Sequence, residues 1–410
     1  RDLHRLIRRQ RQMCIRDRLD TGSFLIMDVV RRLGPIARTD IARVTGLSPP
    51  VISMLTRELL QMGFLKEDGL DASRGGRKPI LLRISPGALY VVGVDIGVTK
   101  TRVAVVDLEA KIVKSRTIPT NPEIGKEITI HRLTRMIREL VEESDLSRDK
   151  IEGMGVGISA IVNHEKGTCL FWPNVEGWEN VPLAEILEDE FDIPVMVDDS
   201  ARTMALAEYW CGAAKDVENF IFVNVGVGVG AAIFFHGQLY RGTTGTAGEL
   251  GHTTVDEKGP RCKCGNYGCL ETLVSGPAIV RRAKEALKEG VISQIDKLVG
   301  GDHQKITPEI VVEAARRGDK LAFNLMEKTG EYLGIAIANA INLFNPQLVV
   351  VGAGVSRAGN LILEPLKRTV RARALESASR NVKIVISELP DEIGALGAAI
   401  LILKKVFEVS

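Results

Sequence analysis

The segment Tyr90-Val-Val-Gly-Val-Asp-Ile-Gly-Val-Thr-Lys100 decides the fold of most of the chain. Its apolar first half predicts a buried strand, and a second apolar run at residues 102–106 follows at once. The first strand therefore ends in Asp95-x-Gly97-x-Thr99 at a tight hairpin. Backbone amides, a hydroxyl and a carboxylate in such a turn can hold a metal-bound phosphate.

Two further glycine-rich turns follow apolar strands later in the sequence. One is Gly226-Val-Gly228, after the run that starts at Phe220, and the other is Gly352-Ala-Gly354. Each turn alone is equally well explained as a structural hairpin or as a strand–helix turn. Three of them in order, separated by amphipathic helices, predict a duplicated α/β fold with a cleft between two lobes.

Two adjacent carboxylates, Asp198 and Asp199, end a predicted strand and precede a helix that starts near Ser200. At the end of a strand, carboxylates can face a cleft. Asp and Ser are also ordinary N-caps of helices, so the position alone does not decide between a site and a cap.

The most specific motif is Gly248-Glu-Leu-Gly-His252 followed by Cys262-Lys-Cys264-Gly-Asn-Tyr-Gly-Cys269-Leu-Glu271. The three thiols and His252 supply the Cys₃His ligand set of a closed tetrahedral zinc site. The alternative, three unligated buried cysteines, has little packing rationale in a reducing compartment. Because four protein ligands leave no open coordination position, we expect Zn²⁺ to be structural and not catalytic.

The charge of the 410-residue chain is divided unevenly along the sequence. The formal net charge is +2, but residues 1–90 hold 17 Lys and Arg against 9 Asp and Glu, and the remainder holds 37 against 43. A basic N-terminal head predicts a nucleic-acid partner, although a solvated basic face gives the same counts. Residues 1–20 are set aside as an uncertain leader because residues 1–18 lack an initiator Met. Residues 21–90 still hold 10 basic against 6 acidic side chains.

The overall composition excludes several classes of protein. With 45% hydrophobic residues, 26% charged residues and 40 glycines, the chain can bury a large core, which argues against disorder and against a disulfide-rich scaffold. No run approaches the ~18–20 consecutive apolar residues that a membrane span needs, and no signal-peptide pattern is visible at the start. We therefore expect a cytoplasmic protein without a membrane partner.

Residues 21–72 predict a helix-turn-helix. An apolar helical stripe stops at Gly34-Pro35, a second helix begins with Thr39 as N-cap and ends at Gly46, and Ser48 caps a third helix that runs to about Met62. An ordinary helical hairpin would give the same pattern. In a helix-turn-helix, the start of the second helix of the pair enters the major groove. The side chains then expected to face DNA are those of Ser48, Pro49, Pro50, Ser53 and Arg57.

Residues 73–88 predict a wing and a linker. The segment Ser73-Arg-Gly-Gly-Arg-Lys-Pro79 lies between two short strand patterns. Its basic side chains, Arg74, Arg77 and Lys78, could enter a narrow minor groove or pair with phosphates. A basic flexible linker is the alternative.

These motifs, in this order, resemble the ROK family (repressor, open reading frame, kinase) over about residues 22–405. The zinc cluster, the Asp95 turn and the fused head are similar to its sugar-responsive repressors, the xylose and N-acetylglucosamine repressor type. The resemblance implies an α/β fold class: a winged helix-turn-helix followed by a two-lobed actin-like ATPase fold. The lobes would span residues 89–198 and 199–410, with the last helix packed back on the first lobe.

The resemblance also implies a function. The protein would be a repressor of carbohydrate-metabolism genes, a homodimer or homotetramer on a palindromic operator in double-stranded DNA. A monosaccharide or small oligosaccharide bound in the cleft would release it, and a sugar-activated activator is a further possibility. Trp172 or Trp178 would offer the sugar an apolar face. The polar sugar contacts implied by motif matching are Asn174, Asp199, Ser200, Glu249, His252 and Glu271.

The chain departs from the kinases of the family at several positions. They read Glu-Asn-Asp-Ala-Asn where this chain has Asp198-Asp-Ser-Ala-Arg202, so Ser200 takes the position of the catalytic Asp. A serine cannot accept the sugar hydroxyl proton at neutral pH without its own base. The alternative is an ATP-dependent, glucokinase-like sugar kinase with a DNA-binding head and Asp199 as base. We favour a vestigial ATP/Mg²⁺ site, which would consist of Asp95, Gly97, Thr99, Gly226, Gly228, Gly352 and Gly354.

Overall fold

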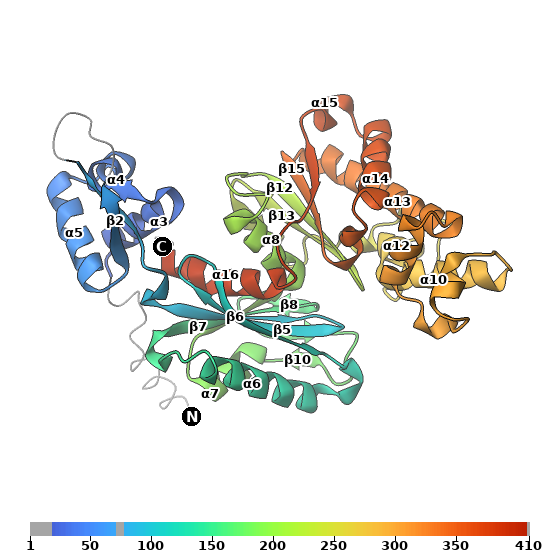
Figure 1. Ribbon diagram of the computed structural model, residues 1–410, viewed down its shortest axis with the longest axis horizontal. Helices are drawn as coiled ribbons and strands as arrows, with labels where there is room; N and C mark the ends of the chain where they lie inside the picture. The colour runs from blue at the N-terminus through green and yellow to red at the C-terminus, as the bar shows by residue number, and fades with distance from the viewer. Residues whose placement is uncertain (1–18, 71–77, 408–410) are drawn as a thin grey trace. The chain divides into compact units, whose positions relative to one another are not determined.

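The computed structural model describes residues 19–70 and 78–407 (Figure 1). The leader at 1–18 and the wing residues Arg74 and Arg77 lie outside the described residues. The chain divides into two compact units: unit 1 is Arg1–Thr203 with Glu392–Ser410, and unit 2 is Met204–Asp391. The chain thus enters unit 2 within one helix and returns to unit 1 before its last helix.

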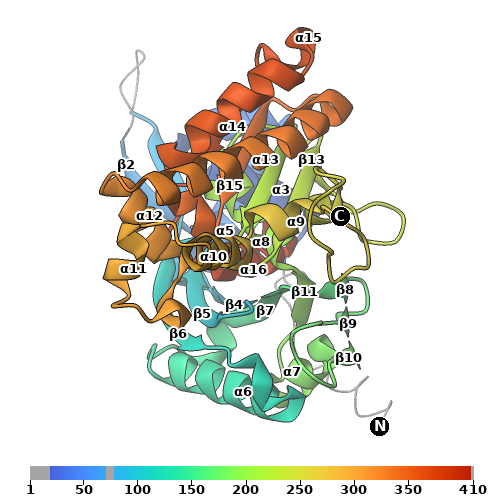
Figure 2. The same ribbon diagram turned by 90° about the vertical axis from the view of Figure 1, so that its right-hand side faces the viewer.

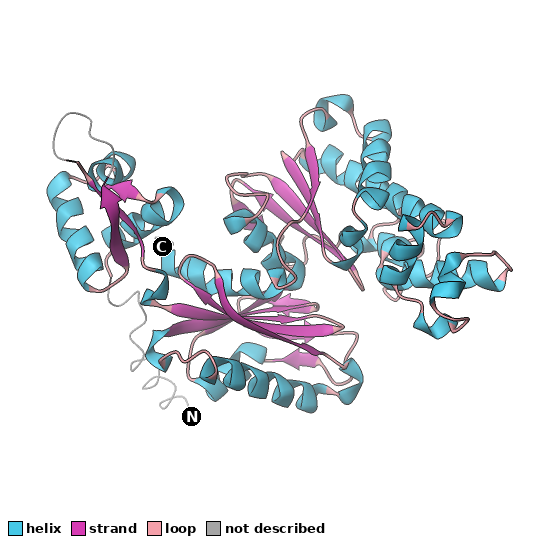
Figure 3. Ribbon diagram, in the orientation of Figure 1, coloured by secondary structure: helices cyan, strands magenta, loops and turns pink. Residues whose placement is uncertain are grey.

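The head of unit 1 consists of three helices and a small antiparallel sheet (Figure 3). Buried apolar side chains from each helix, including Ile26, Ile41 and Ile52, form its core. The second and third helices meet at Gly46, whose φ of 72° lies in the left-handed region that glycine favours. This agrees with the expected helix-turn-helix, and β2 and β3 form an antiparallel strand pair that follows it. Its elements are α3 (Thr21–Leu33), β1 (Ile36–Ala37), α4 (Arg38–Thr45), α5 (Pro49–Gln61), β2 (Leu65–Leu70) and β3 (Ile80–Ile84), with strand order β1-β3-β2.

Two details of the helix starts in the head differ from the sequence-based expectation. Thr39 is not an N-cap: Ala37 pairs with Leu81 in the sheet, and the strand runs directly into α4, which already begins at Arg38. Ser48 does occupy the N-cap position of α5, but its side chain makes no capping hydrogen bond to the described residues. An exposed Ser48 hydroxyl is therefore available to an external partner.

The first lobe is built on a five-stranded mixed sheet in the order β11-β7-β4-β5-β6. Strands β4, β5 and β6 form an antiparallel meander, whereas β7 and β11 run parallel to β4. Helices α6 and α7 cover one face of the sheet and α16 the other (Figure 1). The bounds are β4 (Tyr90–Ile96), β5 (Lys100–Asp107), β6 (Ile112–Pro119), α6 (Lys126–Glu142), β7 (Ile151–Ile158), α7 (Leu183–Phe191), β11 (Val195–Asp199) and α16 (Ile393–Phe407).

The last helix, α16, lies very close to the sheet of the first lobe. A Cβ atom on Gly93 of β4 would come within 1.9 Å of the Ala395 carbonyl oxygen, and one on Gly155 of β7 within 1.7 Å of the Ala398 carbonyl oxygen. Only glycine leaves room for a helix backbone at this distance. The helix is buried along most of its length, and its end also contacts α3 of the head.

A small three-stranded sheet, β10-β9-β8, adjoins the first lobe. Trp172 and Trp178 lie in its connections, with ring centroids 5.0 Å apart in an edge-to-face arrangement. They are 0% and 1% exposed and belong to the core of the lobe. The expectation that either ring offers a face to a sugar is therefore wrong. The strands are β8 (Ile161–Asn163), β9 (Thr168–Phe171) and β10 (Glu179–Val181).

Unit 2 contains a second five-stranded sheet, in the order β14-β13-β12-β15-β16. Again the first three strands form an antiparallel meander and the last two run parallel to the first, so both sheets have the same topology. The duplicated fold expected from the three glycine turns is thereby confirmed. The strands are β12 (Phe220–Val225), β13 (Val229–Phe235), β14 (Gln238–Tyr240), β15 (Leu348–Gly352) and β16 (Lys383–Ile386).

Buried side chains of the helices and of the sheet form one hydrophobic core in unit 2, and its two longest helices, α13 and α14, lie side by side (Figure 2). None of the helices within residues 19–70 and 78–407 is long and apolar enough to cross a membrane. The helices that lie wholly or partly in this unit are α8 (Ser200–Cys211), α9 (Leu270–Val274), α10 (Gly276–Lys288), α11 (Gln294–Leu298), α12 (Pro308–Arg316), α13 (Lys320–Phe344), α14 (Asn360–Arg373) and α15 (Glu376–Ser379).

Candidate functional site

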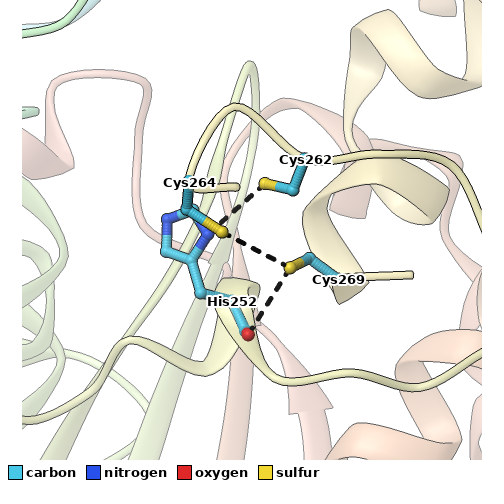
Figure 4. A group of neighbouring side chains, drawn as sticks. All are labelled: His252, Cys262, Cys264 and Cys269. Carbon is cyan, nitrogen blue, oxygen red and sulfur yellow. Dashed lines mark hydrogen bonds between the residues drawn. The ribbon is translucent and has the colours of Figure 1, made fainter. Parts of the chain in front are cut away.

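The predicted metal ligands His252, Cys262, Cys264 and Cys269 converge in unit 2 (Figure 4). Their ligand atoms all lie within 4.8 Å of one another. Cys264 Sγ is 3.7 Å from Cys269 Sγ, and Cys262 Sγ is 3.6 Å from His252 Nδ1. A tetrahedron with metal–sulfur bonds of about 2.3 Å has edges of about 3.8 Å. The four side chains therefore have the spacing that a tetrahedral metal ion needs.

The loop that carries the thiols is folded back on itself. The Cys262 amide donates to the Asn266 carbonyl at 2.7 Å, and Gly268 has a φ of 61°. The hydrogen bond from the Asn266 backbone lowers the pKa of the exposed Cys264 thiol to about 7, whereas burial raises the pKa of the Cys262 and Cys269 thiols, so Cys264 is the thiol of the three that ionises most readily. Thiolates are the form that binds metal, and the cluster can thus hold a divalent cation.

The two predicted sugar-binding carboxylates of unit 2 flank this metal-binding cluster. Glu249 immediately precedes the short 3₁₀ helix η4 (Leu250–His252), and Glu271 lies in the first turn of α9, two residues after Cys269. Gly248, with a φ of 103°, brings the loop onto β13: a Cβ atom there would be 2.0 Å from the Ala231 carbonyl oxygen. The cluster and the sheet together fix the backbone segments that carry both carboxylates.

The imidazole of His252 has two different neighbours. Its Nδ1 faces Cys262, whereas its Nε2 lies 4.0 Å from the exposed Glu249 carboxylate. One nitrogen can therefore ligate a metal while the other remains directed at the carboxylate. The Glu271 carboxylate is held by the second glycine turn, because its Oε2 accepts a 3.0 Å hydrogen bond from the Val229 amide.

The other three predicted sugar ligands, Asn174, Asp199 and Ser200, belong to unit 1. Asp199 Oδ1 accepts hydrogen bonds from the amides of Ala201 (2.8 Å) and Arg202 (3.3 Å), so this carboxylate caps the start of α8. Asn174 is half-buried in the connection between β9 and β10. Asp198 is buried and forms a 3.1 Å ion pair with Arg202. Of the two carboxylates at the end of β11, one is a cap and the other is neutralised inside the lobe.

The Asp95 carboxylate is occupied by other side chains. Its Oδ1 accepts from the Ser200 hydroxyl at 3.2 Å, and its Oδ2 lies 3.4 Å from Arg102 Nη1. Ser159 in turn donates to Ser200 at 3.3 Å. Burial raises the pKa of Asp95, an effect that Arg102 and Ser200 partly offset. This carboxylate is therefore part of a polar cluster with Arg102, Ser159 and Ser200.

The remaining predicted nucleotide-binding glycines lie in tight turns. Gly97 is tied to the end of β6 because the Thr120 hydroxyl donates to its carbonyl at 2.7 Å, and Thr120 also bonds Thr99 through the backbone. In unit 2, the Gly226 amide donates to the Gly228 carbonyl at 2.9 Å. A Cβ atom on Gly226 would lie 3.9 Å from the Ala353 methyl group, so the turns at 226–228 and 352–354 are neighbours.

The predicted DNA-facing side chains share one face of α5. Ser48, Pro49, Pro50, Ser53 and Arg57 are all exposed, while Ile52, Leu55 and Leu59 are buried. Lys78 is exposed just before β3. Sequence reasoning missed Met54, which is half exposed on the same face. Helical periodicity places it one turn after Pro50 and could have identified it.

Comparison with known proteins assigns the class. The ROK family model matches residues 91–405, and the chain belongs to this family. The xylose repressor of Caldicellulosiruptor bescii is 34% identical over 371 residues, which are 90% of this chain and 92% of that protein. The match to the repressor includes the head, which the family model leaves out.

Two solved structures of related proteins differ in the share of this chain that they match. A crystal structure of a ROK family transcriptional regulator, described as a homologue of the E. coli MLC protein, has a TM-score of 0.81 at 29% identity and covers 94% of this chain and 96% of its own. A ROK family glucokinase from Streptomyces griseus, in complex with glucose and AMPPNP, has a TM-score of 0.69 at 31% identity. It covers 76% of this chain and 98% of its own. The body is a two-lobed actin-like ATPase fold, and the head distinguishes it from the kinase.

Proposed function

We propose that the protein is a sugar-responsive transcriptional repressor of carbohydrate-metabolism genes in the cytoplasm. The observation that carries this proposal is the head: the similarity to the xylose repressor and to the MLC-like regulator spans at least 90% of the chain, whereas the glucokinase matches 76%. The exposed face of α5, with Arg57, is suited to the major groove of an operator. The basic wing residues Arg74, Arg77 and Lys78 would add phosphate or minor-groove contacts.

We assign the effector as a monosaccharide or small oligosaccharide bound by the polar side chains implied by the family motifs. Carboxylates, an amide and an imidazole suit pairs of sugar hydroxyls, which each donate and accept hydrogen bonds. Glu249 and His252, 4.0 Å apart, are such a pair of partners. The ligand set is Asn174, Asp199, Ser200, Glu249, His252 and Glu271.

We assign the metal in the Cys₃His cluster as Zn²⁺ with a structural role. Zinc prefers tetrahedral thiolate and imidazole ligands, and with four protein ligands it has no position left for a substrate. Its part in the function would be to hold the loop between Glu249 and Glu271 in one conformation. Because His252 contacts both the cluster and Glu249, metal binding and sugar binding should be linked.

The coupling follows from differential binding. A homodimer or homotetramer would place two α5 helices on the half-sites of a palindromic operator. If the sugar binds the DNA-free form more tightly than the DNA-bound form, it lowers operator affinity by the ratio of the two sugar affinities. No covalent step is needed, which agrees with Ser200 in the position of the kinase base.

The test has two stages. The zinc-loaded full chain selects duplexes from a random-sequence pool, and anisotropy then measures affinity for the selected duplex with a panel of mono- and disaccharides. We expect one sugar to weaken binding by 10-fold or more, which corresponds to about 1.4 kcal/mol of coupling. Unchanged affinity with every sugar would contradict the proposal that a sugar releases the protein from its operator. Deletion of the gene decides between a repressor and an activator, because loss of a repressor raises expression of its target whereas loss of an activator lowers it.

A sugar kinase with a DNA-binding head is the second candidate, favoured by the similarity of the lobes to the glucokinase bound to glucose and AMPPNP. Its base would be Asp199, but this carboxylate already accepts two backbone hydrogen bonds as the cap of α8. Sugar-dependent ADP release that Asp199→Asn abolishes would establish the kinase and displace the repressor as the main function.

A further inference from the structure

The outward face of α5 has an apolar centre. On a helical projection, Pro50, Met54 and Arg57 follow one another at i, i+4 and i+7, and Ser53 and Glu58 flank them. All five are exposed, and Met54 has 50% of its surface accessible. The opposite face, with Ile52, Leu55 and Leu59, is buried in the head. The centre of the face that would point into a groove therefore offers two apolar side chains, those of Pro50 and Met54, and one guanidinium.

This composition restricts which bases the helix can read. Asn and Gln recognise adenine and Arg or Lys recognise guanine through paired hydrogen bonds, whereas Asp and Glu accept from cytosine. The first two turns of α5 contain neither Asn nor Gln, and Pro50 has no amide hydrogen to donate. The apolar feature of the major-groove edge is the C5-methyl group of thymine. Pro50 and Met54 match that group in chemistry.

We infer that Pro50 and Met54 read thymine methyl groups in each operator half-site, with Arg57 next to them on a guanine or a phosphate. This inference rests on the proposed DNA-binding function. The neighbouring charges favour DNA over a protein partner on this face. Residues 21–90 carry a basic excess, Arg57 shares the face, and the Arg38 guanidinium is held beside α5 by a 3.0 Å hydrogen bond to Thr56. Glu58, at the edge of the face, would disfavour close phosphates and so contribute to register.

Replacement of thymine by uracil tests the inference directly, because uracil keeps the O4 acceptor and the pairing but lacks the methyl group. The full chain first selects a duplex from a random pool, and each thymine of the selected half-site is then replaced singly. Burial of one methyl group is worth about 0.8 kcal/mol, so affinity should fall about four-fold at the thymines that are read. Replacement in both half-sites should multiply the losses.

Two variants make the test specific to the residue. Met54→Ala should bind the thymine-containing duplex more weakly than the wild type does. At one position it should also lose most of the affinity difference between thymine and uracil. Met62→Ala is the matched control, because Met62 is 48% exposed but is the C-cap residue of the same helix, about two turns beyond Met54. It should keep the full four-fold effect. Since both methionines are exposed, melting curves should show that each variant remains folded.

The outcomes separate the inference from the function on which it rests. If no duplex is enriched, the DNA-binding function fails and the inference fails with it. If a duplex is enriched but no uracil replacement changes affinity, the protein binds DNA and the inference is wrong. Retention of the full uracil effect in Met54→Ala would also overturn the role of Met54. So would a change of oligomeric state in that variant, measured by sedimentation, because Met54 would then belong to a protein interface.

Discussion

The Ser200 hydroxyl lies 3.2 Å from Asp95 Oδ1, and the two side chains join the start of α8 to the end of β4. The resemblance to the kinases of the family implies that Ser200 takes the position of their catalytic carboxylate, a group that must be free to accept a proton. Here the hydroxyl donates to a carboxylate that is itself buried and paired with Arg102. The cluster is a polar connection inside unit 1 in which the Asp95 carboxylate already has two side-chain partners.

The variant Ser200→Asp should destabilise the protein without creating a kinase. A second buried carboxylate beside Asp95 raises the pKa of the pair, because two adjacent negative charges are unfavourable. The native state would then bind more protons than the unfolded chain, so the loss of stability should grow as pH rises from about 5 to 8. Thermal melting across this range, with Ser200→Ala as control, measures it. A gain of ATP-dependent sugar phosphorylation at unchanged stability would contradict this view of the cluster.

In the wild-type protein, Asp95 alone should make the free energy of unfolding fall as pH rises, by less than in Ser200→Asp. Burial is the largest influence on Asp95 and raises its pKa above the ordinary value. A carboxyl group with a raised native pKa contributes stability that is lost as pH rises from about 4, the unfolded value, through the native pKa. Asp95→Asn should remove this contribution to the slope of the free energy of unfolding against pH. A slope between pH 4 and 7 that is identical in wild type and variant would show that Asp95 does not titrate differently in the two states.

The duplicated lobes were predictable because the constraint is local. A hairpin such as Gly226-Val-Gly228 and a strand–helix turn such as Gly352-Ala-Gly354 need particular residues, and the apolar runs before them mark buried strands. The metal ligands were predictable for a similar reason, since three thiols within eight residues and a nearby histidine are typical of a metal site. These features depend on short stretches of chain, which a sequence displays directly.

Other features depend on contacts that no short stretch displays. Trp172 and Trp178 flank a turn with Asn174 and Glu176, and the sequence does not tell whether such rings face a ligand or each other. They pack on each other in the core. Thr39 has the chemistry of an N-cap, but pairing of Ala37 with Leu81 starts the helix earlier. Segments distant in the sequence decide both outcomes, because the lobe core buries the two rings and Leu81 pairs with Ala37.

Removal of the metal should destabilise unit 2 and weaken sugar binding. The cluster joins the loop from His252 to Cys269 to the start of α9. Metal analysis should find one zinc per chain, and a strong chelator should lower the melting temperature. Cys264→Ser should lose the metal and should melt at a lower temperature, as the chelator-treated protein does. Cys211→Ser, an exposed thiol outside the cluster, is the control and should keep full zinc content. A full complement of zinc in Cys264→Ser would exclude the Cys₃His assignment.

The packing of α16 predicts a strong effect for a very small substitution. In Gly155→Ala the new methyl group would lie 1.7 Å from the Ala398 carbonyl oxygen, a backbone atom that cannot rotate away. Either α16 moves off the sheet or the sheet bends, and overpacking of this kind costs about 1–3 kcal/mol or more. Since the end of α16 also contacts α3, displacement of the helix should disturb the head as well. Hydrogen exchange should therefore increase both in α16 and in α3.

Gly354→Ala is the matched control for this experiment. Gly354 has an ordinary backbone conformation, and a Cβ atom there meets nothing within 4 Å among the described residues. The control should melt within about 0.5 kcal/mol of the wild type, because a surface substitution without contacts has little effect. If Gly155→Ala melts like the control, the close approach of α16 to β7 is not maintained in solution. If it unfolds the lobe but leaves exchange in α3 unchanged, α16 stabilises the sheet and does not transmit its position to the head.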